Sequence, residues 1–183
     1  MMKRLKVAIL CVTVTIPFLS APVLVAEDTK HVPQAPIPLQ IVAAKRVFIG
    51  NAGGDERPYE DAQFSGGSDR TYNDFYADMK SWGRYELVAA PAEADLLFEI
   101  SFSQVQYPQA GSLSSPIYDP QIRLLIRDPK TSAVLWGLTE HVQGALLQGN
   151  HDKNFDQAVM RIVAEVQRIA TPSAAVTEGS KKQ

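Results

Sequence analysis

Segment 50–69, which runs from Gly50 to Asp69, holds the residue types best suited to ligand chemistry. It contains the pairs Gly53-Gly54 and Gly66-Gly67 among several acidic side chains. Glycine-rich turns before a helix can hold phosphate, but this segment matches neither standard phosphate-loop pattern and its acidic charge would repel phosphate. Clustered carboxylates suit calcium, yet the EF-hand spacing is absent. A solvated loop, a partner-binding loop and a calcium site are the interpretations that stay open.

The histidines and serines form no standard catalytic pattern. His141 and His151 are expected at one rim of the domain, with Asp119 and Asp152 nearby. These residue types suit a transition metal, but no compact metal-binding motif links them, and two surface histidines are the alternative. The chain has no G-x-S-x-G elbow, and the serines near Ser114 fit turn chemistry. We therefore expect a protein that is not an enzyme and needs no metal or cofactor, with a hydrolase as the least favoured reading.

The composition is that of an ordinary globular domain. The chain has 183 residues, of which 45% are hydrophobic and 21% are charged, and its formal net charge is −2. These values exclude a globally disordered or collagen-like chain. They also argue against a nucleic-acid partner, because neutralising phosphates requires an excess of Lys and Arg.

The first 26 residues are predicted to be a secretory signal peptide. Lys3, Arg4 and Lys6 precede an apolar run of about ten residues, as in the charged and hydrophobic parts of such signals. Cleavage is expected after Ala26, with Ala21 as the second choice. The alternative is an uncleaved membrane anchor, which the two prolines of this region disfavour. The mature protein is thus expected to be secreted or periplasmic and to meet the membrane only through the transient signal.

The remaining chain divides into three parts. Residues 27–38 contain three prolines and are predicted to be a linker, and residues 171–183 are predicted to be a disordered polar tail. One domain is expected over residues 39–170. Cys11 is the only cysteine and lies within the predicted signal, so the mature domain would contain no disulfide.

Hydrophobic periodicity predicts the elements of this domain. Strands are expected over residues 41–49, 85–90, 96–107, 122–126 and 134–142, and helices over residues 71–82 and 152–170. Thr71 and Asp74 resemble a capping box, and Gly83 is expected to end the first helix. Asp152 is expected either to cap the second helix or to be an anion in its first turn.

The element order β-α-β-β-β-β-α predicts an α+β fold. Several strands alternate between polar and apolar residues, which is typical of a sheet covered on one face. We therefore expect a two-layer sandwich in which two helices cover one face of a mixed or antiparallel sheet of about five strands.

The lengths of the connections predict the strand directions. A helix between the first two strands implies a parallel pair, whereas the short link 91–95 implies that strand 96–107 runs antiparallel to its predecessor. Asp128-Pro129 is typical of a hairpin turn. One rim is then expected to carry segment 50–69, link 91–95 and the Asp128 turn, and the opposite rim residues 108–120 and 144–153.

Three short motifs resemble a known group of proteins. They are ADLLFEI at residues 94–100, RDPKT at 127–131 with VLW at 134–136, and NFDQAV at 154–159. The chain resembles uncharacterised exported bacterial envelope domains of the "domain of unknown function" lipoprotein type and is similar to the N-terminal domain of TolB. The resemblance implies a domain with one sheet and two helices that binds other envelope proteins, and it implies no catalytic residues. A lipidated N-terminal cysteine and a downstream propeller, found in some of these proteins, are not expected in this chain.

The sheet face away from the helices is the predicted binding surface. Its expected residues are Leu97, Glu99, Arg123, Leu125 and Arg127. A partly apolar exposed face is typical of a docking surface. The alternative is that the loop 108–120 folds over this face. We expect an auxiliary or assembly role through a protein partner; the alternative is a periplasmic protein that binds a small ligand or metal at the rim of segment 50–69.

Overall fold

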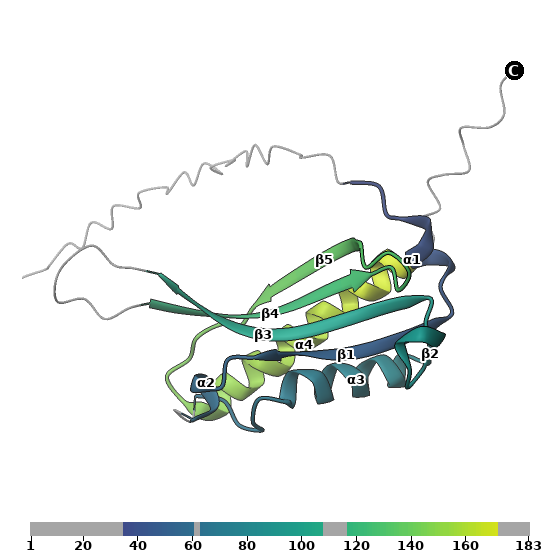
Figure 1. The fold of residues 1–183 in the computed structure, drawn as a ribbon. Helices are drawn as coiled ribbons and strands as arrows, with labels where there is room; N and C mark the ends of the chain where they lie inside the picture. The colour runs from purple at the N-terminus through teal and green to yellow at the C-terminus, as the bar shows by residue number, and fades with distance from the viewer. Residues whose placement is uncertain (1–34, 61–62, 108–116, 172–183) are drawn as a thin grey trace, which may run out of the picture. The chain divides into compact units, whose positions relative to one another are not determined.

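The computed structural model describes residues 35–60, 63–107 and 117–171, with the side chains of residues 59 and 60 left out (Figure 1). Residues 36–183 form one compact unit as far as they are described. The predicted signal peptide with Cys11, most of the predicted linker, the serines near Ser114 and residues 172–183 lie outside the described residues.

Five strands form one mixed sheet, as the sequence predicts. Along the chain they are β1 (Arg46–Gly54), β2 (Glu86–Leu87), β3 (Leu96–Tyr107), β4 (Ile117–Arg127) and β5 (Val134–His141). Their order across the sheet is β2-β1-β3-β4-β5. β1 is parallel to both β2 and β3, whereas β3, β4 and β5 are successively antiparallel.

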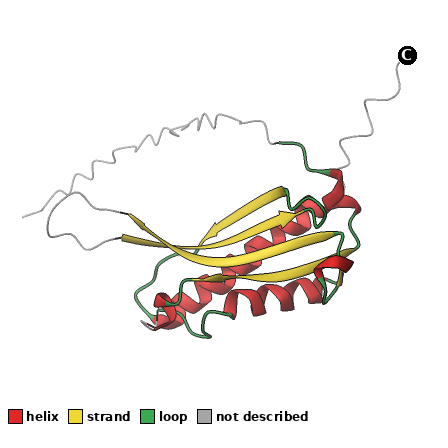
Figure 2. Ribbon diagram, viewed as in Figure 1, coloured by secondary structure: helices red, strands yellow, loops and turns green. Residues whose placement is uncertain are grey.

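Two long helices lie on the same face of this sheet (Figures 1 and 2). They are α3 (Arg70–Trp82) and α4 (Gln148–Ala170). Shorter helices are α1 (Leu39–Ala43), α2 (Arg57–Glu60) and the 3₁₀ turn η1 (Pro91–Glu93). The predicted α+β sandwich, with helices on the sheet, is therefore confirmed.

The core lies between the sheet and the two long helices. Successive residues of β3 alternate between buried and half-buried because side chains of a strand point to opposite faces in turn. The buried set of β3 comprises Leu96, Phe98, Ile100 and Phe102. Opposite it lie Phe75 and Met79 of α3 and the apolar stripe of α4, whose buried members are Phe155, Ala158, Val159, Ile162, Val163, Val166, Ile169 and Ala170.

The predicted capping of α3 is right at its end and wrong at its start. Gly83 adopts φ 68° after the last turn, a left-handed conformation that glycine adopts without steric cost. The residue before the helix is Asp69, and its side chain makes no cap hydrogen bond. No capping box forms, because Thr71 is buried and the carboxylate of Asp74 binds the guanidinium of Arg70.

The second long helix begins earlier than predicted. α4 starts at Gln148 after an extended Leu147, so Asp152 lies inside the helix rather than at its cap. His151 likewise belongs to α4 instead of preceding it. The apolar stripe marks only the part of the helix that packs on the sheet, and its polar first turn leaves no such signal.

The expected strand 41–49 divides into a helix and a strand. α1 occupies residues 39–43, and β1 runs on to Gly54 into the segment predicted as loop. Ile41 is fully buried, and its carbonyl accepts a hydrogen bond from the Tyr85 hydroxyl at 3.2 Å. A short apolar run has no distinct period, so a tertiary contact decides its conformation. The expected strand 85–90 is likewise reduced to two residues, after which the chain turns into η1.

One predicted strand direction and the rim assignment are wrong. β2 and β3 are both parallel to β1 and flank it on opposite sides, so they do not form an antiparallel pair. The link between them crosses the start of β1, where the Asp95 carboxylate accepts hydrogen bonds from the backbone N–H groups of Lys45 and Arg46. Because β2 is only two residues long, the chain has only a short distance to return before β3 begins. A short link is therefore sufficient.

This crossing changes which segments share a rim. Asp95 and the Asp128 turn lie where β1 begins, and Asp128 there accepts a hydrogen bond from Gln40 of α1. Residues 63–69 lie at the opposite rim with the start of α4, where the Ser65 N–H donates to Asp152 at 2.9 Å. The hairpin turn itself is confirmed, because the Lys130 N–H donates to the Asp128 carboxylate at 2.7 Å.

Candidate interaction face and the rim beside it

The five predicted binding residues share the sheet face that points away from α3 and α4. Register places Leu97 between Phe48 and Arg127, and places Glu99 beside Leu125. Arg123 lies opposite Ser101 on the same face. In the described part of the chain no helix lies over this face (Figure 2). We call it the open face, defined by Leu97, Glu99, Arg123, Leu125 and Arg127 together with Phe48.

The charges of the open face are only partly compensated. Arg127 donates through Nε to Glu99 at 2.7 Å and through Nη1 to the carbonyl of Ser132 at 3.1 Å. Arg123 is exposed, and within the described residues its guanidinium donates no hydrogen bond and forms no ion pair. Among those residues, the open face therefore carries an unpaired positive charge on Arg123, next to the half-buried Leu125.

The open face lacks a side chain next to Leu125. Gly137 of β5 pairs with Leu125, and a Cβ added at Gly137 would lie 3.5 Å from Cδ2 of Leu125. The missing side chain leaves Leu125 accessible from that side. A partner side chain would gain apolar contact with Leu125 there.

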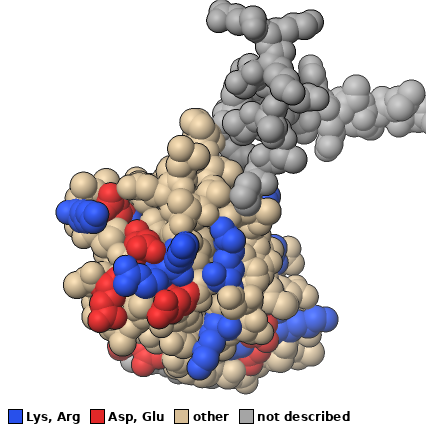
Figure 3. Space-filling view, turned by 90° about the vertical axis from the view of Figure 1, so that its right-hand side faces the viewer, with Lys and Arg blue, Asp and Glu red and all other residues tan. Residues whose placement is uncertain are grey.

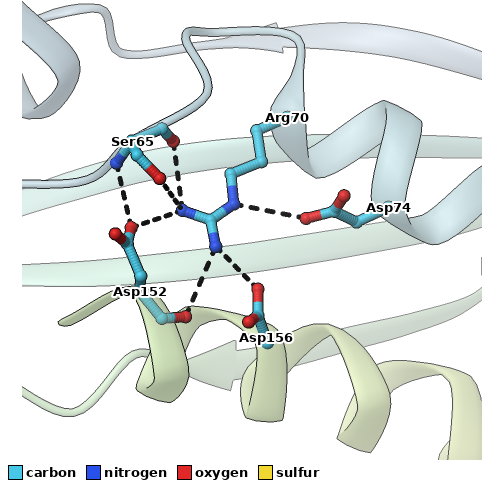
Figure 4. Close-up of polar contacts among 5 residues, drawn as sticks. All are labelled: Ser65, Arg70, Asp74, Asp152 and Asp156. Carbon is cyan, nitrogen blue, oxygen red and sulfur yellow. Dashed lines mark hydrogen bonds and ion pairs between the residues drawn. The ribbon is translucent and has the colours of Figure 1, made fainter. Parts of the chain in front are cut away.

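At the rim, a polar cluster that sequence reasoning missed joins α3 to α4 (Figure 4). The Arg70 guanidinium contacts Asp152 and Asp156 at 2.6 Å each and Asp74 at 3.3 Å. It also donates to the carbonyl of Ser65 at 3.0 Å. We call these five residues the Arg70 clamp.

The planar guanidinium group of Arg70 is contacted on its flat face as well as at its nitrogen atoms. Its guanidinium carbon lies 4.4 Å from the centroid of the Phe155 ring, and its side chain is only 11% exposed. Cations over aromatic rings gain electrostatic energy that grows as water is excluded. Because every nitrogen of the guanidinium has an acceptor, the clamp is a structural contact between distant segments and leaves no donor for a ligand. Asp152 and Asp156 lie more than 80 residues from Arg70 in the sequence, so no local motif predicts their contact with it.

Two carboxyl groups of the clamp have pKa values that are shifted in opposite directions. Burial by itself raises the pKa of Asp152, but hydrogen bonds from the Ser65 N–H and from Arg70 outweigh it and hold that pKa below its ordinary value. For Asp74, burial is the largest effect and raises the pKa despite the neighbouring Arg70. The charged form of Asp152 is thus favoured by its hydrogen bonds, whereas burial disfavours the charged form of Asp74.

Acidification should therefore weaken the clamp through Asp152. Its folded pKa is lowered, so its contribution to stability is complete above the ordinary carboxyl pKa and is lost as pH falls through the folded value. We expect Asp152→Asn to be less stable than the native protein at pH 7 and to lose less stability on acidification. Urea midpoints from pH 7 to pH 3, followed by circular dichroism, measure both effects.

Asp74→Asn is the matched control for this prediction. Ionised Asp74 opposes stability above its ordinary pKa, so its replacement should cost less at pH 7 than Asp152→Asn. An Asp152→Asn variant whose midpoint falls with pH as steeply as that of the native protein would contradict the assignment.

The two predicted rim histidines do line one cavity, of about 290 Å³. His141 Nδ1 lies 2.8 Å from Asp119, and the ring of His151 meets Phe64 edge-on. Nδ1 of His151 is buried and has no hydrogen-bond partner among the residues that the structure describes. Asp152, which was expected here, is engaged in the Arg70 clamp instead. In the described residues no three His, Cys, Asp or Glu side chains are grouped so that they could hold a metal ion.

Two carboxylates of segment 50–69, those of Asp55 and Asp69, bind other groups of the domain. Asp69 accepts a hydrogen bond from the Asn51 amide at 2.7 Å, and Asp55 accepts one from the backbone N–H of Gln104. These bonds tie the segment to β1 and β3. They do not converge on one point, as the ligands of a calcium ion do.

Charges of both signs are interspersed on the end of the domain drawn in Figure 3. At this end Arg46 pairs with Asp95 at 3.6 Å, and Arg84 donates to the carbonyl of Val42 at 2.9 Å. Among the described helices, none combines the length and the apolar character that crossing a bilayer requires.

Comparisons with known proteins find likeness only at the level of structure. No protein-family model matches the chain, and no curated protein matches it. A hypothetical protein from Chlamydia trachomatis superposes with a TM-score of 0.46 at 12% identity, covering 70% of this chain and 98% of that chain. A Xanthomonas campestris protein of the DUF330 family gives a TM-score of 0.42 at 11% identity, covering 68% and 82%.

A variant of PelC from Paraburkholderia phytofirmans, solved as a dodecamer, gives a TM-score of 0.43 at 13% identity and covers 67% of this chain and 87% of that chain. Uncharacterised domains are thus among the structures that this chain resembles. At these identities and TM-scores the likenesses assign neither a family nor an activity. The resemblance to TolB and to lipoprotein-type domains stays a prediction.

Proposed function

We propose that this protein is a non-catalytic, exported envelope protein that acts by binding another protein at the open face. The observation that carries the proposal is Arg123, an exposed cation without a partner among the described residues, which precedes the half-buried Leu125 on the same face of β4, with the half-buried Leu97 further along that face. An apolar surface with a free charge at its margin is typical of a docking surface, in which the apolar part supplies affinity and the charge supplies orientation.

The chemistry of the open face defines the partner. It should present an apolar patch with a carboxylate placed opposite Arg123. A second copy of this chain fits less well, because Glu99 already pairs with Arg127 and each open face would bring an uncompensated Arg123 to the other. Like charges across an interface oppose association, so the proposal is a different protein with an acidic margin.

Export is the second part of the proposal. It is supported by the charged and apolar pattern of the first 26 residues and by the predicted absence of cysteine from the mature domain. The partner would then be an envelope protein that the mature domain meets after crossing the membrane, and the role an auxiliary or assembly role.

The experiment compares two charge reversals in exposed basic residues. Arg123→Glu should lower recovery of the crosslinked partner at least tenfold, because it replaces the orienting cation with a repelling anion. Lys80→Glu makes the same change in charge on exposed α3, on the other side of the domain, and should leave recovery unchanged. The measurement is photo-crosslinking in the native envelope from a crosslinker at position 125, with circular dichroism to verify folding. Equal recovery from both variants would refute the proposal.

A small-ligand role at the histidine cavity is the second candidate. It is favoured by the buried, unpartnered Nδ1 of His151 in the cavity that His141 and Asp119 also line. Isothermal titration with zinc, calcium and nucleotides tests it. Heat of binding that His151→Phe abolishes would support it, and silence with all three probes would eliminate those ligands.

A further inference from the structure

The outer edge of β1 is covered by β2 only where β1 begins. β2 pairs with β1 at Arg46 and Val47, and the chain then turns away toward η1. β1 continues to Gly54, and on this side it has no further strand neighbour in the described part of the chain. Beyond Val47, the backbone N–H and C=O groups on this side of β1 therefore have no neighbouring strand among the described residues.

The hydrogen bonds of β1 show which of its residues face that edge. The carbonyls of Lys45 and Val47 accept from Glu86 and Val88 at 2.8 and 3.0 Å, so they point toward β2. The carbonyl of Arg46 accepts from Asp95 at 2.8 Å and points toward β3. Because backbone groups alternate along a strand, the N–H and C=O groups of Ile49 and Asn51 point to the uncovered edge.

A groove runs beside this edge. It is a cavity of about 510 Å³ lined by β1 from Phe48 to Asn51, by residues 87–89, and by Tyr72 and Tyr76 of α3. The two tyrosine rings lie 5.9 Å apart between centroids and form an aromatic floor. No described residue that lines the groove is charged. An uncharged groove favours an occupant without charge, because desolvating an unpaired ion is costly.

This edge lacks the features that keep other sheet edges from pairing. Native edge strands are commonly protected by charged residues, proline or a covering element. At β5, the opposite edge, the Arg161 guanidinium binds Glu140 at 2.7 Å and the His141 carbonyl at 3.0 Å. Residues 48–51 have neither a charge nor a proline. The sheet edge at β5 is thus protected, whereas the edge at β1 can pair with a further strand.

We infer that the edge of β1 from Ile49 to Asn51 binds an extended, uncharged segment of a partner protein as an additional strand. The segment continues the row that β2 begins and exchanges backbone hydrogen bonds with Ile49 and Asn51. One of its apolar side chains lies on Tyr72 and Tyr76, whose rings are the part of the groove that α3 contributes. This site shares Phe48 with the open face but does not depend on Arg123.

The test begins with the full-length chain and a phage library of random eight-residue peptides. Peptides that bind should be uncharged and should alternate apolar residues with polar ones, as a strand over a groove requires. For the best synthetic peptide, the double variant Tyr72→Ala/Tyr76→Ala should raise Kd at least tenfold. Tyr76→Phe keeps the ring, and Arg123→Glu alters only the open face, so each should change Kd less than twofold.

Amide hydrogen exchange provides a readout that does not depend on these side chains. Peptide binding should slow exchange at Ile49 and Asn51 at least tenfold and leave Gly50 unchanged, because the Gly50 amide faces β3. The same peptide with its backbone nitrogens methylated should not bind.

Several outcomes would overturn the inference. They are no enrichment from the library, equal binding by the double tyrosine variant, or protection at β5 in place of β1. A dimer in sedimentation equilibrium that the double variant dissociates would also overturn it, since the occupant would then be a second copy. Because Arg123→Glu tests the open face separately, failure of one proposal does not entail failure of the other.

Discussion

Replacing Phe98 with alanine is expected to lower the free energy of unfolding by about 3–5 kcal/mol. Phe98 is fully buried in the central strand β3, and its ring meets Phe75 of α3 and Tyr85 at centroid distances of 6.4 and 5.9 Å. Truncation would leave a cavity between the sheet and α3 that rigid neighbours cannot fill. Urea unfolding followed by far-UV circular dichroism measures the loss.

The neighbouring residue provides the matched control. Leu97 precedes Phe98 on the same strand but points to the open face and is only half-buried. Leu97→Ala should cost no more than about 1 kcal/mol, because it removes partly exposed methyl groups and leaves no enclosed cavity. Similar losses at the two positions would show that β3 does not divide into a core face and an open face.

Replacing Arg70 with alanine is expected to cost about 2–3 kcal/mol, since hydrogen bonds between charged groups contribute more than neutral ones. The change removes the hydrogen bonds from Arg70 to Asp152, Asp156 and Ser65. It also leaves the partly desolvated carboxylate of Asp152 without its cation. The value is placed below that of a fully buried ion pair because Asp156 is 56% exposed and water replaces part of its contact. The same unfolding experiment measures it.

Two further variants separate geometry from charge at this position. Arg70→Lys keeps the positive charge but lacks the planar fork that reaches several acceptors at once, so it should recover only part of the loss. Arg168→Ala removes an exposed arginine that pairs with Glu165, and it should change stability by less than about 0.5 kcal/mol. A loss at Arg70 no greater than that at Arg168 would mean that the clamp contributes nothing.

Both predictions concern residues that hold the scaffold together. Neither substitution removes a residue from the proposed binding surfaces. Phe98 holds the sheet against α3, which positions the tyrosine floor beside β1. The Arg70 clamp holds segment 63–69 against the start of α4. Partner binding at the open face should be retained in Arg70→Lys wherever the variant remains folded, because no clamp residue belongs to that face.

The fold class could be predicted because it depends on local periodicity. The alternation of residues 96–107 matches β3 at both ends, and the apolar stripe of α4 is evident in the sequence. Each pattern reports how one segment meets the core, and a segment's own spacing is enough to show this. The placement of the five predicted binding residues on one face follows from the same alternation.

The order of the strands and the contents of the rims could not be predicted in this way. β3 lies beside β1 because the link after β2 crosses the start of β1, and nothing in residues 91–95 encodes which neighbour the next strand will choose. The Arg70 clamp joins residues more than 80 positions apart, and the β1 edge is uncovered only because β2 is so short. The spacing of apolar residues along the chain is enough to predict which side of each element faces the core. Which polar groups meet and which backbone edge stays uncovered depend on contacts between segments that are far apart in the chain, and these contacts exist only once the chain has folded.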